Sequence, residues 1–208
     1  TFHSVANRLL RRYGNACGLS DGFTVMDRSD SESLFGILRS EHGFGTTKTR
    51  FPRKETIAAI YSRVVSSRIP LSDSVKARFP WCSDHVEDIA TLFKAYTVRK
   101  RKQNIIDCDD LILYWQALMD SPSGDTVRGL FDHVLVDEYQ DTNQSQADLL
   151  MSLCGTAGNL TVVGDDAQSI YSFRAAEVEN ILSFPTRYDD CTVVTLERNY
   201  RSTPQILA

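Results

Sequence analysis

The segment His133–Asn143 reads HVLVDEYQDTN and contains the pattern that decides the fold class of the chain. Its short apolar run, Val134–Val136, suits a buried β-strand, and helix-start residues follow a few positions later. Two carboxylates, Asp137 and Glu138, stand directly at the end of this run. Because ligands of open parallel α/β sheets bind beyond the carboxyl ends of the strands, we expect both carboxylates to face a ligand crevice.

Acidic side chains at a strand end suit the chemistry of nucleotide hydrolysis. A Mg²⁺ ion bound to a nucleotide would need an oxygen ligand where Asp137 lies, and the attacking water would need a base where Glu138 lies. The order of strand, Asp-Glu and helix also occurs by chance in α/β proteins. The motif alone therefore leaves a purely structural interpretation open.

The composition is that of an ordinary soluble globular protein, with 42% hydrophobic and 24% charged residues among 208. No apolar run approaches the ~20 residues that a membrane span needs, and no signal peptide opens the chain. We therefore expect a cytoplasmic protein without a membrane partner. The cysteines are far apart and form no C-x-x-C pair, so the sequence indicates neither a disulfide framework nor a zinc site.

The net charge of −4 conceals an uneven distribution along the chain. Residues 48–102 contain 13 Lys or Arg and 5 Asp or Glu, whereas residues 103–208 contain 5 and 17. A basic middle indicates contact with a phosphate backbone, although a solvated helical face is the commoner origin of such a run. Nucleic acid is thus a candidate partner that charge alone does not decide.

Two patterns of periodicity divide the chain. Up to about Asn104 apolar residues recur at helical spacing and strands are scarce, beginning with a helix that Thr1 or Ser4 can cap. After Asn104 helices, the first of them capped by Asp107, alternate with apolar strands predicted at 134–136, 160–164 and 192–196. Polar residues follow each strand, so we expect the three strand ends to form one crevice of a doubly wound sheet.

Polar and aromatic residues after the second predicted strand suit a nucleotide-dependent contact with single-stranded nucleic acid. Gln168 supplies an amide that could hydrogen-bond a γ-phosphate or the attacking water. Tyr171 and Phe173 supply rings on which bases could stack, and Arg174 supplies a guanidinium for a phosphate. The structural alternatives are a surface glutamine and aromatic residues of the core.

An aromatic residue and a cation also follow the third predicted strand. Tyr200 could stack on adenine, and Arg201 could stabilise the charge of a phosphoryl-transfer transition state. Two strands that end in Asp-Glu and Gly-Asp-Asp, each followed by a glutamine, distinguish the chain from an arbitrary α/β sequence.

Five segments together resemble the motifs of a known helicase family. VDEYQDTN at Val136–Asn143, VGDDAQSIYSFRA at Val163–Ala175 and LERNYRST at Leu196–Thr203 are similar to motifs II, III and IV of the UvrD/Rep/PcrA group in superfamily 1. TFHS at Thr1–Ser4 resembles motif Ib, and DCDDL at Asp107–Leu111 resembles the D-F-D-D-L of that group with Cys in place of Phe. The motifs follow in the family's order and span the whole chain.

The resemblance implies roles for the residues around the first two strand ends. Asp137 would hold magnesium, usually through water, and Glu138 would be the general base or would orient the attacking water. Gln140 and Gln168 would couple the state of the γ-phosphate to DNA contacts. ATP and Mg²⁺ are therefore the implied cofactors.

Further site residues follow from the same resemblance. Arg201 would be an arginine finger, and Tyr200 would stack on adenine. The DNA contacts would be made by His3, Tyr171, Phe173 and Arg174. Phe173 stands where the family often has tryptophan, so base stacking would be kept with a smaller ring.

The implied fold is α/β: part of a RecA-like parallel-sheet domain, of the P-loop NTPase kind, with an all-helical insertion. Residues 1–18 and 105–196 would belong to this RecA-like domain 1A. Residues 19–104 would form the helical insertion 1B, which contacts duplex DNA in this family and would account for the basic middle. Residues 197–208 would carry motif IV and begin a second RecA-like domain.

The implied activity is ATP-driven 3′-to-5′ movement on single-stranded DNA and unwinding of duplexes at ss/ds junctions, in DNA repair or replication. No G-x-x-x-x-G-K-S/T phosphate loop occurs in the sequence, and motifs V and VI are missing. We therefore expect a fragment of a longer helicase that is inactive alone. Two alternatives stay open: a non-catalytic DNA-binding or interaction module derived from a helicase, and a RecB- or AddA-like helicase-nuclease subunit.

Overall fold

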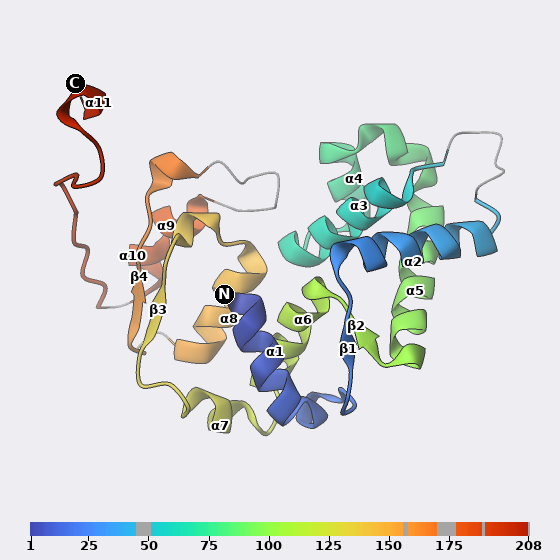
Figure 1. Cartoon of the computed structure of the whole chain (residues 1–208), viewed down its shortest axis with the longest axis horizontal. Helices are drawn as coiled ribbons and strands as arrows, with labels where there is room; N and C mark the ends of the chain where they lie inside the picture. The colour runs from blue at the N-terminus through green and yellow to red at the C-terminus, as the bar shows by residue number, and fades with distance from the viewer. Residues whose placement is uncertain (45–50, 156–157, 170–177, 189, 208) are drawn as a thin grey trace.

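A computed structural model of the chain shows a mostly helical molecule with two small parallel sheets (Figure 1). The structure describes residues 1–44, 51–155, 158–169, 178–188 and 190–207. Two groups of helices lie side by side, and the sheet that follows His133 lies at one end of the molecule (Figure 1). No helix in these described ranges is both long and apolar enough to span a membrane.

The first group of helices, which we call the central body, forms one apolar core. Its elements are α1 (Phe2–Tyr13), the 3₁₀ helix η1 (Gly14–Cys17), α6 (Cys108–Met119), α7 (Gly124–Arg128) and α8 (Gln144–Cys154). Leu10, Trp115 and Leu149, from three of these helices, are buried in this core. Two predicted helix caps are confirmed, because the side chains of Thr1 and Asp107 accept hydrogen bonds from backbone N–H groups in the first turns of α1 and α6.

The second group, which we call the helical body, has its own aromatic core. Its elements are α2 (Arg28–Glu41), α3 (Lys54–Ser67), α4 (Leu71–Arg78), the 3₁₀ helix η2 (Pro80–His85) and α5 (Val86–Gln103). Phe35 stacks on Tyr96 with ring centroids 4.0 Å apart, and Tyr61 meets the Tyr96 ring edge-on. Among the described residues between β1 (Thr24–Val25) and β2 (Ile105–Ile106), all regular elements are helices, as the sequence periodicity predicts.

Two short strands stand where the chain enters and leaves the helical body. β1 (Thr24–Val25) pairs in parallel with β2 (Ile105–Ile106), so the two connections run side by side. Arg11 of α1 donates from Nη1 to the carbonyl oxygen of Phe23 at 2.6 Å and thereby fixes the first connection to the central body. The helical body therefore starts and ends at one place on the central body.

The second sheet is a βαβ unit in which α8 connects the parallel strands β3 (Val134–Val136) and β4 (Leu160–Val162). Gly155 ends α8 with a φ of 65°, a conformation that favours glycine. The short helices α9 (Glu179–Leu182) and α10 (Phe184–Arg187) complete this end of the molecule. A small core of Val136, Tyr139, Leu150, Phe184 and Tyr188 holds the unit together.

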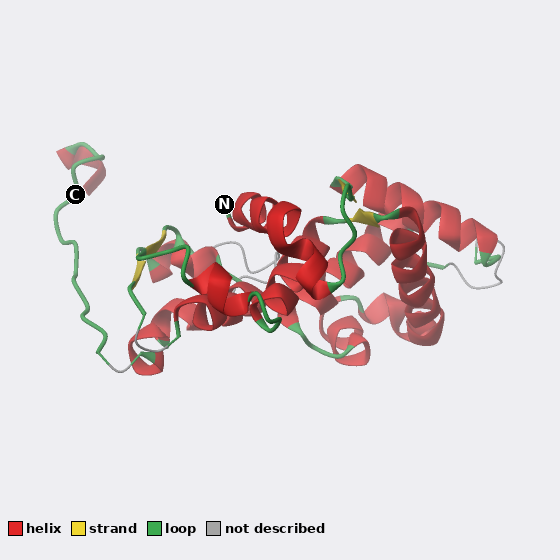
Figure 2. Ribbon diagram, turned by 90° about the horizontal axis from the view of Figure 1, so that it is seen from below, coloured by secondary structure: helices red, strands yellow, loops and turns green. Residues whose placement is uncertain are grey.

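The prediction of a third strand at residues 192–196 is wrong. This segment is not a strand but an exposed extended chain, in which Val194 is 74% and Leu196 is 83% exposed. It leads away from β3 and β4 to the terminal helix α11 (Pro204–Leu207) (Figures 1 and 2). A β-propensity run becomes a strand only where a neighbour pairs with its backbone, and no described strand lies beside this one. Two strand ends, not three, therefore meet at the predicted crevice.

Candidate functional site

The turn after β3 holds its two carboxylates in an unusual backbone conformation. Glu138 has φ 52° and ψ 45°, in the left-handed region, and Asp137 Oδ1 accepts a hydrogen bond from the Glu138 N–H at 3.0 Å. Such a conformation costs a non-glycine residue on the order of 1 kcal/mol and is concentrated at functional sites. Both side chains are exposed and follow directly on β3.

A buried glutamine connects this turn to the end of the neighbouring strand. Gln140 is 1% exposed, and its Nε2 donates to Glu138 Oε2 at 2.6 Å. Its Oε1 accepts a hydrogen bond from the Asp165 N–H at 3.1 Å. One amide side chain therefore fixes the orientation of the Glu138 carboxylate and the distance between the two strand ends.

The close approach of the two turns requires a glycine at position 164. A Cβ there would lie 2.5 Å from Gln140 Oε1 and 3.2 Å from the Tyr139 nitrogen. The backbone continues the pairing of β3 and β4 at this point, since the Tyr139 N–H donates to the Val163 carbonyl at 2.9 Å. Gly164 thus contributes to the site because the absence of a Cβ lets the two turns approach each other.

Asp165 extends the hydrogen-bonded network to Gln168. Its Oδ1 accepts from the Ala167 N–H at 3.0 Å and caps the 3₁₀ helix η4 (Asp166–Gln168), while its Oδ2 accepts from Gln168 Nε2 at 2.7 Å. We call Glu138, Gln140, Asp165 and Gln168 the strand-end network. The network joins Glu138 and Gln168, which the sequence predicts as catalytic, through Gln140, which it predicts as cofactor-binding. Asp165, the fourth member, was not predicted.

Three residues of the site were missed by sequence reasoning, and two of them had a usable signal. Gly-Asp-Asp directly after a strand could have identified Gly164 and Asp165, because a glycine there permits close approach and an aspartate caps the next turn. Asn180 on α9 had no such signal. It is fully buried, and its Nδ2 donates at 3.0 Å to the carbonyl of Thr142, 38 residues earlier.

Other predicted site residues lie apart from the strand-end network. His3 is exposed on α1, and Tyr200 and Arg201 are exposed on the extended C-terminal segment that leads away from the sheet (Figure 1). The Arg198 guanidinium lies 4.9 Å from the centre of the Tyr200 ring. Tyr171, Phe173 and Arg174 lie outside the described residues. The roles of these six residues stay predictions.

The residues at the strand end fit a magnesium ion held jointly with a nucleotide. Magnesium in phosphoryl-transfer sites keeps several waters and binds one or two carboxylates together with phosphate oxygens. Asp137 supplies one exposed carboxylate of this kind. The described residues contain no cluster of three or more His, Cys, Asp or Glu side chains that could hold a metal ion by themselves.

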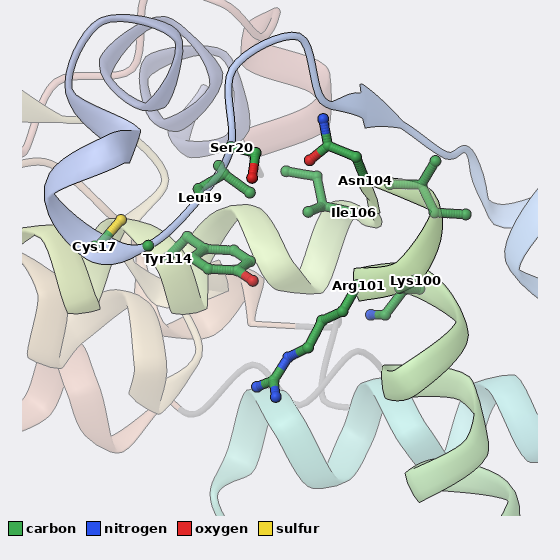
Figure 3. Close-up of a pocket in the computed structure, with 10 residues that line it drawn as sticks. Cys17, Leu19, Ser20, Lys100, Arg101, Asn104, Ile106 and Tyr114 are labelled. Atoms are coloured by element: carbon green, nitrogen blue, oxygen red, sulfur yellow. The ribbon is translucent and has the colours of Figure 1, made fainter.

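One cavity among the described residues lies elsewhere, where the helical body meets the central body. It measures about 400 Å³ and is lined by residues that include Lys100, Arg101, Asn104 and Tyr114 (Figure 3). No residue of the strand-end network lines it. The candidate functional site lies at the strand ends, where hydrogen-bonded polar groups converge.

Two carboxylates stand at a strand end, and a buried glutamine connects one of them, Glu138, to the next strand end. This arrangement suits nucleotide hydrolysis. The comparison with protein families specifies the class. A model of the UvrD/REP helicase N-terminal domain matches residues 1–189, and the chain belongs to this helicase family. The resemblance inferred from the motifs is thereby confirmed.

Individual relatives carry the name ATP-dependent DNA helicase PcrA. The chain is 35% identical over 210 residues to the protein of Staphylococcus epidermidis, 36% over 211 residues to that of Leuconostoc citreum, and 34% over 210 residues to that of Staphylococcus aureus. Each match covers 100% of this chain but only 27–28% of the relative. The chain thus spans a little over a quarter of the length of these relatives.

Proposed function

We propose that the chain supplies the water-activating side of the ATP site in a DNA helicase that moves 3′ to 5′ on single-stranded DNA and opens ss/ds junctions, in DNA repair or replication and in the cytoplasm. The observation that carries this proposal is the strand-end network. It places Glu138 at the end of a strand beside Asp137 and connects it by side-chain hydrogen bonds to Gln168. Membership in the helicase family supports DNA as the substrate.

The proposed chemistry divides between the two acidic residues. Asp137 would hold Mg²⁺, which when bound neutralises charge on the phosphates of ATP. Glu138 would accept the proton of the attacking water or orient that water. The 2.6 Å hydrogen bond from Gln140 holds the Glu138 carboxylate in a fixed orientation, so the base is positioned before the nucleotide arrives.

Gln168 would report the state of the nucleotide to DNA. Its amide is held by Asp165, and the segment with Tyr171, Phe173 and Arg174 follows directly in the chain. In the proposal these three residues and His3 contact single-stranded DNA. Tyr200 would stack on adenine and Arg201 would stabilise transition-state charge, which requires the C-terminal segment to lie against the strand ends when ATP is bound.

We propose the domain division given by the sequence: residues 1–18 and 105–196 in the RecA-like domain 1A, 19–104 in the helical insertion 1B, and 197–208 in the next domain. Two features support it. The helical body has a core of its own, and its chain connections pair as β1 and β2. Its basic charge suits the duplex contact proposed for the insertion.

ATP turnover by the full-length protein tests the proposal. We expect single-stranded DNA to stimulate hydrolysis, and strand separation to require ATP and a 3′ single-stranded tail. We expect negligible turnover from the 208 residues alone, because their sequence contains no phosphate loop. DNA binding without any ATP turnover by the full-length protein would favour the non-catalytic module, and ATP-dependent strand cleavage would favour the helicase-nuclease alternative.

A further inference from the structure

Helix α8 begins directly after the candidate site and is fixed to it. The Thr142 hydroxyl donates to the carbonyl of Tyr139 at 2.7 Å. The Asn143 side chain accepts from the Gln146 N–H at 2.9 Å, and Gln146 Oε1 accepts from the Asn143 N–H at 3.0 Å, so a capping box sets the first turn of α8. A displacement of α8 therefore moves the turn that carries Glu138.

The first turn of α8 also holds the end of α3 in the helical body. Ser145 is buried, and its hydroxyl contacts the carbonyl oxygens of Ser66 at 3.0 Å and Val65 at 3.3 Å. These carbonyls belong to the last turn of α3, where backbone acceptors have no partner inside the helix. The hydrogen-bond donor for the end of α3 is thus Ser145 of α8, the helix that follows the candidate site.

An ion pair strengthens the same contact one turn later. Asp148 Oδ2 lies 3.0 Å from Arg68 Nη1, and the Gln144 amide donates to Asp148 Oδ1 at 2.6 Å. Arg68 ends α3 in the left-handed conformation, with φ 56°. Both oxygens of Asp148 are therefore engaged, and its position on α8 is set relative to α3.

A second attachment holds the helical body at α6. Lys100 of α5 is 2% exposed and donates to Asp107 Oδ2 at 2.6 Å and to Asp110 Oδ2 at 2.5 Å. Asp107 also accepts from the Tyr96 hydroxyl at 2.8 Å. With α6 and α8 both attached, the helical body cannot rotate about its two strand connections without breaking one of these contacts.

We propose that Ser145, Asp148 and Arg68 are positioning residues that couple the helical body to the Glu138 turn, so that DNA bound by the helical body changes the rate of ATP hydrolysis. This inference rests on the function proposed above. α8 is the connecting element, because its capped start follows directly on the Glu138 turn, which the Thr142–Tyr139 hydrogen bond closes, and Ser145 and Asp148 of α8 contact the end of α3. The Lys100 contacts with Asp107 and Asp110 hold the helical body at α6 while the contact with α8 changes.

A charge swap in the full-length protein tests the coupling. The variants are Arg68→Asp, Asp148→Arg and the double variant, together with Ser145→Ala and the conservative Ser145→Thr. The matched control is Arg28→Asp, which breaks the pair Arg28–Glu32 within α2 at its exposed member. The readouts are ATP turnover without DNA, its stimulation by saturating junction DNA, and the thermal midpoint.

We expect the two single charge variants and Ser145→Ala to keep turnover without DNA and to lose at least threefold in stimulation. The double swap, Ser145→Thr and the control should stimulate within twofold of the wild type. Wild-type stimulation in both single variants would overturn the coupling and leave the proposed function intact. Failure of the double swap to restore stimulation would also overturn it.

Hydrogen exchange separates the coupling from the proposed function, because it needs no activity. In the 208-residue chain, Arg68→Asp should increase exchange of the amides of Tyr139–Asn143 at least threefold, and the double swap should reverse the increase. Unchanged exchange in this turn would overturn the coupling. A wild-type protein without ATP turnover would overturn the proposed function, and the exchange result would still decide whether α8 transmits displacement to the turn.

Discussion

The polar network around Lys100 and the strand-end network both contain carboxylates, and they differ in what they leave for a ligand. Around Lys100, the carboxylates of Asp107 and Asp110 are buried, and both are paired with the Lys100 ammonium group within the chain. In the strand-end network the connecting amide of Gln140 is buried, whereas Glu138 and the adjacent Asp137 are exposed. The buried network suits attachment of the helical body to the central body, and the exposed carboxylates of the strand ends suit binding of a ligand.

The electrostatics of the buried network follow from its geometry. Burial alone would lower the pKa of Lys100, but the neighbouring carboxylates of Asp107 and Asp110 outweigh it and raise the pKa above its ordinary value. Lys100 therefore stays charged over the whole physiological range. Its ammonium also lies 4.4 Å from the centre of the Tyr96 ring, where the ring face attracts a cation.

The largest effect on stability is expected when the buried network loses its cation. Lys100→Met leaves Asp107 and Asp110 as buried carboxylates without a counter-charge, which should cost about 3–5 kcal/mol in the free energy of unfolding. Denaturant unfolding of the chain measures this loss. Arg28→Met, which breaks an exposed ion pair, should cost about 0.5 kcal/mol or less. Equal losses in the two variants would contradict the distinction between the networks.

The next largest effect tests the close approach at the strand ends. Gly164→Ala places a Cβ against Gln140 Oε1, which cannot yield without losing its hydrogen bond from Asp165. The expected loss is about 1–3 kcal/mol. Gly129→Ala is the control, because its nearest atom is 3.5 Å away and the change should stay within about 0.5 kcal/mol. Indifference of the chain to Gly164→Ala would mean that the two turns are not held together.

A smaller effect should depend on pH. Burial raises the pKa of Asp109 to about 6 from its ordinary 3.8, and the nearby Asp107 carboxylate adds to the rise. The folded state then binds a proton more tightly than the unfolded state, so Asp109 lowers the free energy of unfolding as pH rises from about 4 to about 6. Asp109→Asn should be more stable than the wild type at pH 7, by on the order of 1 kcal/mol, and equal to it near pH 4.

Unfolding of both proteins between pH 4 and pH 7 measures this difference. Ser62 can still donate to the amide oxygen of the variant, as it donates at 3.0 Å to Asp109 Oδ1, so the packing is conserved. A difference that does not change with pH would contradict the raised pKa.

Local signals allowed the sequence to predict much of this structure. The helix caps at Thr1 and Asp107 and the Asp-Glu pair after Val134–Val136 depend on residues that are neighbours in the chain. The predicted closeness of the first two strand ends followed from a general rule for parallel sheets. These expectations needed no knowledge of contacts between distant residues.

The sequence could not predict features that depend on distant partners. The hydroxyl of Ser145 meets α3 carbonyls 79 and 80 residues away, and no pattern in the chain marks that pairing. Lys100 stands in a basic run whose ordinary explanation is a solvated helix end, yet it is buried. The segment 192–196 has strand propensity but no described neighbour to pair with, so it stays extended and exposed.

The smallest expected effect on stability tests the central claim most directly. Glu138→Gln keeps an oxygen that can accept the hydrogen bond from Gln140, so the free energy of unfolding of the chain should change by less than about 0.5 kcal/mol. In the full-length protein the same change should lower ATP turnover at least about 100-fold, the size expected for loss of a general base, while ATP still binds. Wild-type turnover in Glu138→Gln would contradict the account.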